Sequence, residues 1–84
     1  MKYRDYKISI EVEYGVVDEY ELNEDESWGE LIGSLTDGWD TYQTGRTWYR
    51  VYRPNEEYQG SYDTDEYSID KIKEIIDKEI DKNV

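Results

Sequence analysis

Nine consecutive residues near the N-terminus, from Tyr6 to Tyr14, alternate strictly between apolar and polar side chains. A period of two is typical of a β-strand, in which successive side chains point to opposite faces of the sheet. An apolar face of this kind must be covered by another layer, so the chain is predicted to build its core around a sheet. The apolar face of this strand consists of Tyr6, Ile8, Ile10, Val12 and Tyr14.

A second alternation covers residues 18–22 and predicts a second strand. A three-residue loop over 15–17 would join the two strands into a hairpin in which Val12 lies beside Tyr20. The apolar faces of the two strands then match.

This register places four carboxylates on the other face of the hairpin, with Glu13 opposite Glu19 and Glu11 opposite Glu21. Like charges in such positions destabilise a hairpin by about a few tenths of a kcal/mol or more per pair. The patch would measure about 5 Å across and about 7 Å along the strands. The longer dimension is close to the phosphate spacing of a nucleic-acid strand, so the patch is a candidate binding surface. The simpler interpretation is an exposed sheet face whose charges prevent aggregation.

Residues 23–37 predict a short amphipathic helix. Asn23 is a favourable N-cap, Glu26 lies at the capping-box position, and acids in the first turn complement the helix dipole. Gly29 and Gly33 each lower the intrinsic stability of this helix by about 1 kcal/mol relative to alanine, so packing must hold it in place. Its apolar residues recur at helical spacing, at Trp28, Leu31, Ile32 and Leu35.

The rest of the chain adds strands and a second helix. Residues 46–53 are β-prone, Pro54 supplies a turn, and residues 57–62 suit a weaker fourth strand. The predicted fold is a single α+β domain over residues 1–84. It has a small antiparallel sheet of three to four strands in the order β-β-α-β-(β)-α, with two helices packed on one face. The second helix follows Ser68 as N-cap, with one face formed by Ile69, Ile72, Ile76 and Ile80.

The composition excludes most catalytic chemistry. The chain has no His and no Cys, which removes the usual general base near neutral pH, thiol nucleophiles, disulfides and the commonest metal ligands. No serine lies at a spacing that suggests a nucleophile with an activating base. The protein is therefore expected to be non-enzymatic and to need no cofactor. Only sixteen residues are Leu, Ile or Val and Phe is absent, so ten Tyr and three Trp must complete the core.

The net charge of the chain limits which partners it can bind. Twenty-two Asp and Glu against ten Lys and Arg give a formal net charge of −12. Such a chain repels nucleic acid and anionic lipid, because binding to phosphates requires Lys and Arg. No stretch approaches membrane-spanning length and the N-terminus lacks the pattern of a signal peptide, so a cytoplasmic location is expected. The natural partner is a basic surface on another protein.

Further acids extend the candidate surface beyond the hairpin. Three lie in the first turn of the predicted helix, where complementing the helix dipole is the simpler interpretation. In the loop that follows, Asp37 and Asp40 flank Trp39. The indole either inserts into a pocket of the partner or packs in the protein's own core. The core is the simpler interpretation, because the chain has few aliphatic residues. The complete set of candidate partner-binding residues is Glu11, Glu13, Glu19, Glu21, Glu24, Asp25, Glu26, Glu30, Asp37, Trp39 and Asp40.

Two other clusters have simpler explanations. Asp63, Asp65 and Glu66 offer oxygen ligands for calcium but lack the glycine turn and distal glutamate of an EF-hand, so a solvated loop is favoured and no metal site is expected. Whether these three acids add to the acidic surface stays open. The arginines of segment 46–53 alternate with aromatic residues, and we expect internal ion pairs or stacking on those rings in place of nucleic-acid binding.

In size, acidity, aromatic content and cytosolic amino-acid usage, the chain resembles the small acidic inhibitors of bacteriophages and mobile elements that mimic DNA. These include anti-CRISPR proteins, anti-restriction proteins and inhibitors of uracil-DNA glycosylase. The resemblance involves no sequence motif. It implies an inhibitor in a bacterial host cell whose carboxylates occupy the nucleic-acid-binding site of a nuclease, first of all a CRISPR effector nuclease. The alternatives are an immunity protein or antitoxin that neutralises a basic nuclease toxin, and a structural or adaptor domain.

Overall fold

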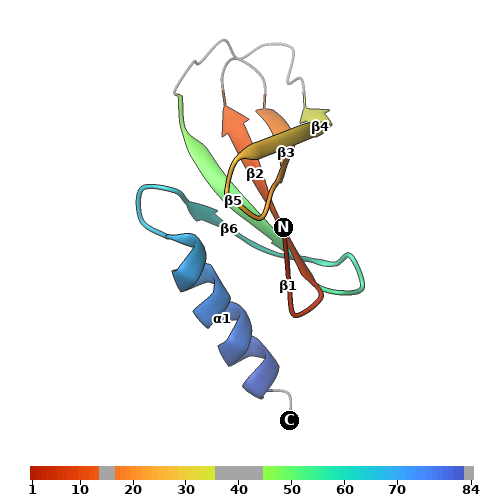
Figure 1. Ribbon diagram of the computed structural model, residues 1–84, viewed down its shortest axis with the longest axis vertical. Coiled ribbons are helices and arrows are strands. Elements are labelled where there is room, and N and C mark those ends of the chain that lie inside the picture. Colours follow the sequence, from red (N-terminus) through yellow and green to blue (C-terminus); the bar gives the residue numbers. More distant parts are fainter. Residues whose placement is uncertain (14–16, 36–44, 83–84) are drawn as a thin grey trace.

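The computed structural model describes residues 1–13, 17–35 and 45–82, which form six β-strands and one α-helix (Figure 1). The strands make one antiparallel sheet in the order β4-β3-β2-β5-β6, and β1 pairs with the N-terminal end of β2. The elements are Lys2–Tyr3 (β1), Tyr6–Glu13 (β2), Val17–Leu22 (β3), Trp28–Leu35 (β4), Thr47–Tyr52 (β5), Tyr58–Asp63 (β6) and Ile69–Lys82 (α1). Three candidate residues lie outside the described part of the chain: Asp37, Trp39 and Asp40.

The first predicted strand is confirmed as β2, which lies at the centre of the sheet. Its side chains at Tyr6, Ile8 and Ile10 are buried, with exposed fractions of 6%, 0% and 4%. Leu22 of β3 and Val51 of β5 join the same core. Full burial of an aliphatic side chain contributes about 1.5–3 kcal/mol. This face of the sheet therefore forms the core, as the alternation predicts.

Helix α1 covers the apolar face and confirms the predicted C-terminal helix. Ile69, Ile72 and Ile76 recur at helical spacing and are buried in the same cluster as the sheet residues. The hydroxyl of Ser68 accepts a hydrogen bond of 3.2 Å from the N–H of Lys71, which confirms Ser68 as the N-cap. Figure 1 shows α1 following β6 at the end of the molecule opposite to β4.

The helix predicted over residues 23–37 is wrong, and so is the α+β fold with two helices. Trp28–Leu35 is the outer strand β4, and the protein is mostly β, with six antiparallel strands and one C-terminal helix in its described part. Asn23 opens a tight turn in which its N–H donates to the carbonyl oxygen of Ser27 at 2.9 Å. The residues that cap helices also favour turns, and two glycines weaken the helix, so pairing with β3 prevails.

The predicted register between β2 and β3 is also wrong, by two residues. Ile10 lies opposite Tyr20, and Glu11 lies opposite Glu19. The reason is that Val17, assigned from the sequence to the loop, already belongs to β3. A shift of two residues keeps every side chain on its original face, so the apolar faces still match.

The remaining strands agree with the sequence, apart from one addition. The β-prone segment 46–53 contains β5, and the weaker strand expected over 57–62 is β6.

The short strand β1 is not predicted by the alternation. It joins β2 through a two-residue turn in which Arg4 and Asp5 have positive φ angles of 50° and 70°. Positive φ at both central residues is the geometry of a type I′ hairpin turn.

Candidate functional site

The sheet face opposite α1 carries a cluster of polar side chains that contact one another. Glu11 is only 3% exposed, and Nη1 of Arg50 donates a hydrogen bond to its carboxylate. Oε2 of Glu19 accepts two hydrogen bonds, from the hydroxyl of Ser9 at 2.5 Å and from that of Tyr52 at 2.8 Å. Two of the four glutamates expected to face a partner are thus hydrogen-bonded within the protein, and the predicted cross-strand pairs Glu13–Glu19 and Glu11–Glu21 do not form.

Burial controls the protonation of this polar cluster. Desolvation raises the pKa of Glu11, and the positive charge of Arg50 opposes that shift. Burial, followed by the hydrogen bond to Glu19, raises the pKa of Tyr52 to about 12. The guanidinium carbon of Arg50 lies 5.4 Å and 4.7 Å from the ring centroids of Tyr52 and Tyr58. Arg50 is therefore held by an internal ion pair and by stacking, which confirms the sequence prediction for this arginine.

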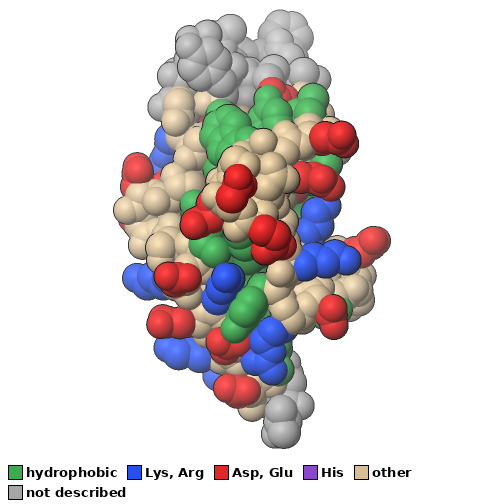
Figure 2. All heavy atoms as spheres, in the orientation of Figure 1, with side chains coloured by type: hydrophobic (Ala, Val, Ile, Leu, Met, Phe, Trp, Pro, Cys, Tyr) green, Lys and Arg blue, Asp and Glu red, His purple; other side chains and the backbone are tan. Residues whose placement is uncertain are grey.

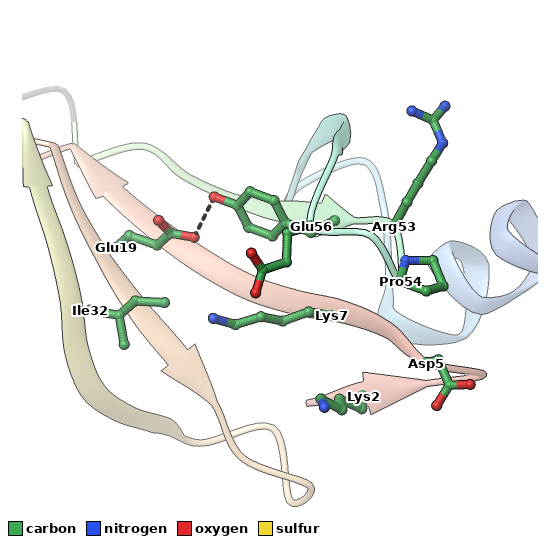
Figure 3. Close-up of a pocket in the computed structure, with 9 residues that line it drawn as sticks. Lys2, Asp5, Lys7, Glu19, Ile32, Arg53, Pro54 and Glu56 are labelled. Atoms are coloured by element: carbon green, nitrogen blue, oxygen red, sulfur yellow. Dashed lines mark hydrogen bonds between the residues drawn. The ribbon is translucent and has the colours of Figure 1, made fainter.

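A cavity of about 370 Å³ lies beside the polar cluster (Figure 3). Figure 3 shows Glu19 and Ile32, from the β3–β4 side, facing Lys7 of β2. Basic and acidic side chains are present in equal number on its walls, so their charges favour no single class of ligand. The charged residues are Lys2, Lys7, Arg53, Asp5, Glu19 and Glu56.

The exposed carboxylates of the candidate set lie on the hairpin formed by β3 and β4. Oδ1 of Asp25 orders the turn by accepting hydrogen bonds from the N–H and hydroxyl of Ser27, at 3.1 Å and 2.5 Å. These bonds lower the pKa of Asp25, which favours its ionised form. Glu13, at the end of β2, is half-buried and does not belong to this group. The exposed acids, together named the acidic hairpin, are Glu21, Glu24, Asp25, Glu26 and Glu30.

Strand β4 places large apolar side chains beside these acids. Trp28, Leu31 and Ile32 are 50%, 55% and 40% exposed. Trp28 stacks on Tyr20 with ring centroids 5.4 Å apart and an interplanar angle of 24°. Figure 2 shows acidic side chains over the β3–β4 hairpin and hydrophobic side chains next to them. Exposed tryptophan and leucine beside charged residues are typical of a surface that binds another protein.

Positive and negative charges are segregated along the chain. No Lys or Arg occurs from residue 8 to residue 45, a stretch that contains eleven Asp and Glu. Within the described ranges, no ion pair involves residues 17–35. The N-terminal ammonium is a nearby positive group, close to Glu21 and Glu24. The ion pairs lie elsewhere: Arg4–Asp77, Arg46–Asp63, Arg50–Glu11, Arg53–Glu57 and Arg53–Glu79.

Among the loop acids before α1, Asp63 stabilises the local structure. Asp63 forms an ion pair with Arg46 at 3.5 Å, and its Oδ1 accepts the N–H of Asp65 at 2.8 Å. In the part of the chain that the structure describes, no group of three or more Asp and Glu is placed to hold a metal ion. The oxygens of Asp63 therefore stabilise the turn that leads into the helix.

The fold and this surface define a small antiparallel β protein with one C-terminal helix and an acidic, partly apolar sheet edge. No protein-family model matches the sequence, and neither a curated protein nor a solved structure matches the chain. None of the described residues form a helix with both the length and the apolar character needed to cross a bilayer.

Proposed function

We propose that this protein is a non-enzymatic inhibitor that places its acidic hairpin on the nucleic-acid-binding site of a basic protein. The segregation of charge carries the proposal. Five exposed carboxylates surround an exposed apolar strand, whereas the described ion pairs of Arg4, Arg46, Arg50 and Arg53 lie outside the hairpin. A surface of this kind is complementary to a groove lined by Lys and Arg.

The mechanism follows from the two kinds of side chain on this surface. Carboxylates attract a basic groove over a distance and raise the rate of association. Trp28 and Leu31 supply apolar contacts that exclude water once the surfaces meet, and such contacts mainly slow dissociation. The bound inhibitor then covers the cations with which the partner holds its nucleic acid.

The proposed surface is smaller than the candidate set from the sequence and is centred on a different strand. Glu11 and Glu19 are left out because Arg50, Ser9 and Tyr52 already satisfy their carboxylates. The acids around β4 take their place. The sequence predicts a partner-binding surface on the face of the sheet, whereas the proposed surface lies at its edge.

The partner class includes a defence nuclease of a bacterial host, such as a CRISPR effector, and a basic nuclease toxin. Both bind phosphates through Lys and Arg, and the same surface serves against either. A neighbouring toxin gene favours an immunity protein or antitoxin, and a prophage setting favours an inhibitor of host defence.

The test is capture of proteins from a bacterial lysate by the immobilised protein, at low salt and at about 0.5 M salt, where exposed charge interactions are largely screened. Competing duplex DNA is added in a parallel sample. We expect a nucleic-acid-handling protein that is captured at low salt, released by salt and displaced by DNA.

Two variants of equal net charge identify the surface. The hairpin variant combines Glu24→Gln, Glu26→Gln and Glu30→Gln. The control variant combines Glu66→Gln, Glu74→Gln and Asp81→Asn at exposed positions in and before α1. Each variant changes the net charge from −12 to −9. Capture should fall by at least about tenfold with the hairpin variant alone, since three charge contacts of about 0.5–1 kcal/mol each are lost.

Other outcomes contradict the proposal. Equal loss with both variants would show that total charge, and not the hairpin, controls binding. Capture that resists salt and DNA would indicate a structural or adaptor role.

A further inference from the structure

We infer that β4 is a docking strand, to which an extended basic segment of the partner adds as a further strand of the sheet. This inference depends on the proposed function, because it describes how the acidic hairpin meets its partner. Strand addition supplies backbone hydrogen bonds for affinity and side-chain pairs for specificity.

The position of β4 makes such pairing available. It is the last strand on its side of the sheet, and none of the described strands pairs with its outer edge. An outer strand presents a row of backbone N–H and C=O groups that can bind another strand. Proteins usually protect long outer strands with Lys or Pro, but β4 has eight residues, neither of these types, and Glu30 as its one charge.

The side chains of β4 suit a partner strand on both faces. Trp28 lies opposite Leu22 and Leu31 lies opposite Tyr20, so both extend the apolar face that α1 covers farther along the sheet. Ile32 lies on the other face, where it lines the cavity of Figure 3. Because these side chains are about half exposed, an added strand would bury apolar surface on both of its faces.

Charge determines which strand can bind. A second copy of this chain also has a net charge of −12, and it would bring a second acidic hairpin against the first. Like charges opposite one another in a sheet are destabilising, whereas opposite charges stabilise the pair. With no Lys or Arg between residues 8 and 45, the edge is complementary to a strand in which Lys or Arg alternates with apolar residues.

The experiment uses a capped peptide of alternating Lys and Val as the probe, with the ¹⁵N-labelled full-length protein observed by NMR. We expect saturable binding and slower amide hydrogen exchange within residues 28–35. Methylation of the backbone nitrogens along one edge of the peptide keeps its charge but removes the pairing hydrogen bonds. This change should weaken binding by at least about tenfold.

Two variants of matched charge locate the binding edge. Leu31→Lys adds a cation to β4 and removes an exposed apolar side chain, so binding of the peptide should be lost. Ser61→Lys adds the same charge at an exposed position on β6, at the opposite end of the sheet, and should bind like the wild type. Thermal melts show whether each variant is folded.

Four results would overturn the inference. Equal binding of the methylated peptide would mean that charge alone is recognised, and the proposed function would then stand without strand addition. Equal binding of a Glu-Val peptide would show that β4 does not select a basic strand. A dimer through β4, detected by sedimentation at high salt, would show that β4 pairs with a second copy of the chain. Equal loss of Lys-Val binding in both lysine variants would show that total charge, and not the β4 edge, controls binding. Failure of the hairpin variant to lose capture overturns the proposed function, whatever the peptide does.

Discussion

The hydroxyl of Tyr52 on β5 reaches across β2 and donates a hydrogen bond of 2.8 Å to Oε2 of Glu19 on β3 (Figure 3). Ser9, on the strand between them, donates to the same oxygen at 2.5 Å. One carboxylate therefore connects three neighbouring strands on the face opposite α1. A glutamate expected to bind a partner is instead part of the network that holds the sheet together.

Tyr52 should lose its proton at a higher pH than an ordinary tyrosine, because burial and the hydrogen bond to Glu19 raise its pKa to about 12. A tyrosine with a raised pKa binds its proton more tightly in the folded chain than in the unfolded chain, where it titrates near about 10. Its contribution to stability is fully present below about pH 10 and is lost as the pH rises toward about 12. Tyrosinate absorbance of the wild type and of Tyr52→Phe, compared over this range, measures the effect.

The matched variant for this titration is Glu19→Gln. It removes a negative charge and a strong acceptor next to the phenol, so the pKa of Tyr52 should move down toward its ordinary value. Ordinary titration of Tyr52 in the wild type would contradict the contact.

Arg50→Met should destabilise the fold, since it leaves Glu11 as a buried charge without its ion-pair partner. The side chains of Glu11 and Arg50 are 4% and 25% exposed, and breaking such a pair should lower the free energy of unfolding by about 2–4 kcal/mol. Burial already raises the pKa of Glu11, and loss of Arg50 raises it further. An acid with a raised pKa favours the folded state at low pH, so this variant should regain stability on acidification.

Urea unfolding of Arg50→Met at neutral pH and at about pH 5 measures this change, in a range where a raised Glu pKa would matter. The double variant Glu11→Leu with Arg50→Met removes both charges and should be more stable than the single variant. Equal stability of Arg50→Met and the wild type at neutral pH would show that the pair contributes nothing.

Regular alternation explains why most of the sheet could be predicted from the sequence. Strands β2 and β5 and helix α1 each show an undisturbed period, and each period reports which side chains are buried. Strand β4 shows no such regular period. Its pairing with β3 changes register twice, once on each side of Tyr20. Such an irregularity breaks the period of two and leaves the apolar residues at spacings that also fit a helix. Local pattern alone cannot distinguish the two.

The candidate surface was predictable only in part, for a different reason. The acids of the turn between β3 and β4 were in the candidate set because charge is visible in the sequence. The burial of Glu11 was not predictable, since it depends on Arg50, which is 39 residues away along the chain. The exposure of Trp28 and Leu31 follows from the position of β4 at the edge of the sheet, and strand order is a property of the whole fold.

Acid should weaken the attachment of α1 to the sheet. Nη2 of Arg53 lies 2.8 Å from Oε1 of Glu79, and the hydroxyl of Tyr6 donates to Oε2 at 2.5 Å. Both contacts lower the pKa of Glu79, and the hydrogen bond from Arg53 has the larger effect. A carboxylate with a lowered pKa stabilises the folded state above its ordinary pKa, and this contribution is lost as the pH falls through the lowered value.

The measurement is the difference in melting temperature between the wild type and Glu79→Gln, followed by circular dichroism from neutral pH to about pH 3, below the ordinary Glu pKa. The difference should shrink as the pH falls. Acid also reduces the repulsion caused by a net charge of −12, and the comparison cancels that common effect. Glu74→Gln, exposed on α1, is the control and should follow the wild type. A constant difference at all pH values would show that ionisation of Glu79 does not hold the helix.

Gly29→Ala distinguishes the strand β4 from a helix over the same residues. In a helix, alanine would raise the free energy of unfolding by about 1 kcal/mol. In the strand, the new Cβ would lie 3.0 Å from Oδ1 of Asn23 and 3.3 Å from the carbonyl oxygen of Glu21, so stability should fall by about 1 kcal/mol. Gly33→Ala is the matched control, because its Cβ would meet Oε1 of Glu19 at an ordinary 3.7 Å, and its effect should stay within about 0.5 kcal/mol. Urea unfolding measures both, and stabilisation by both variants would mean that this segment is helical and that the sheet has no β4 edge for a partner strand to join.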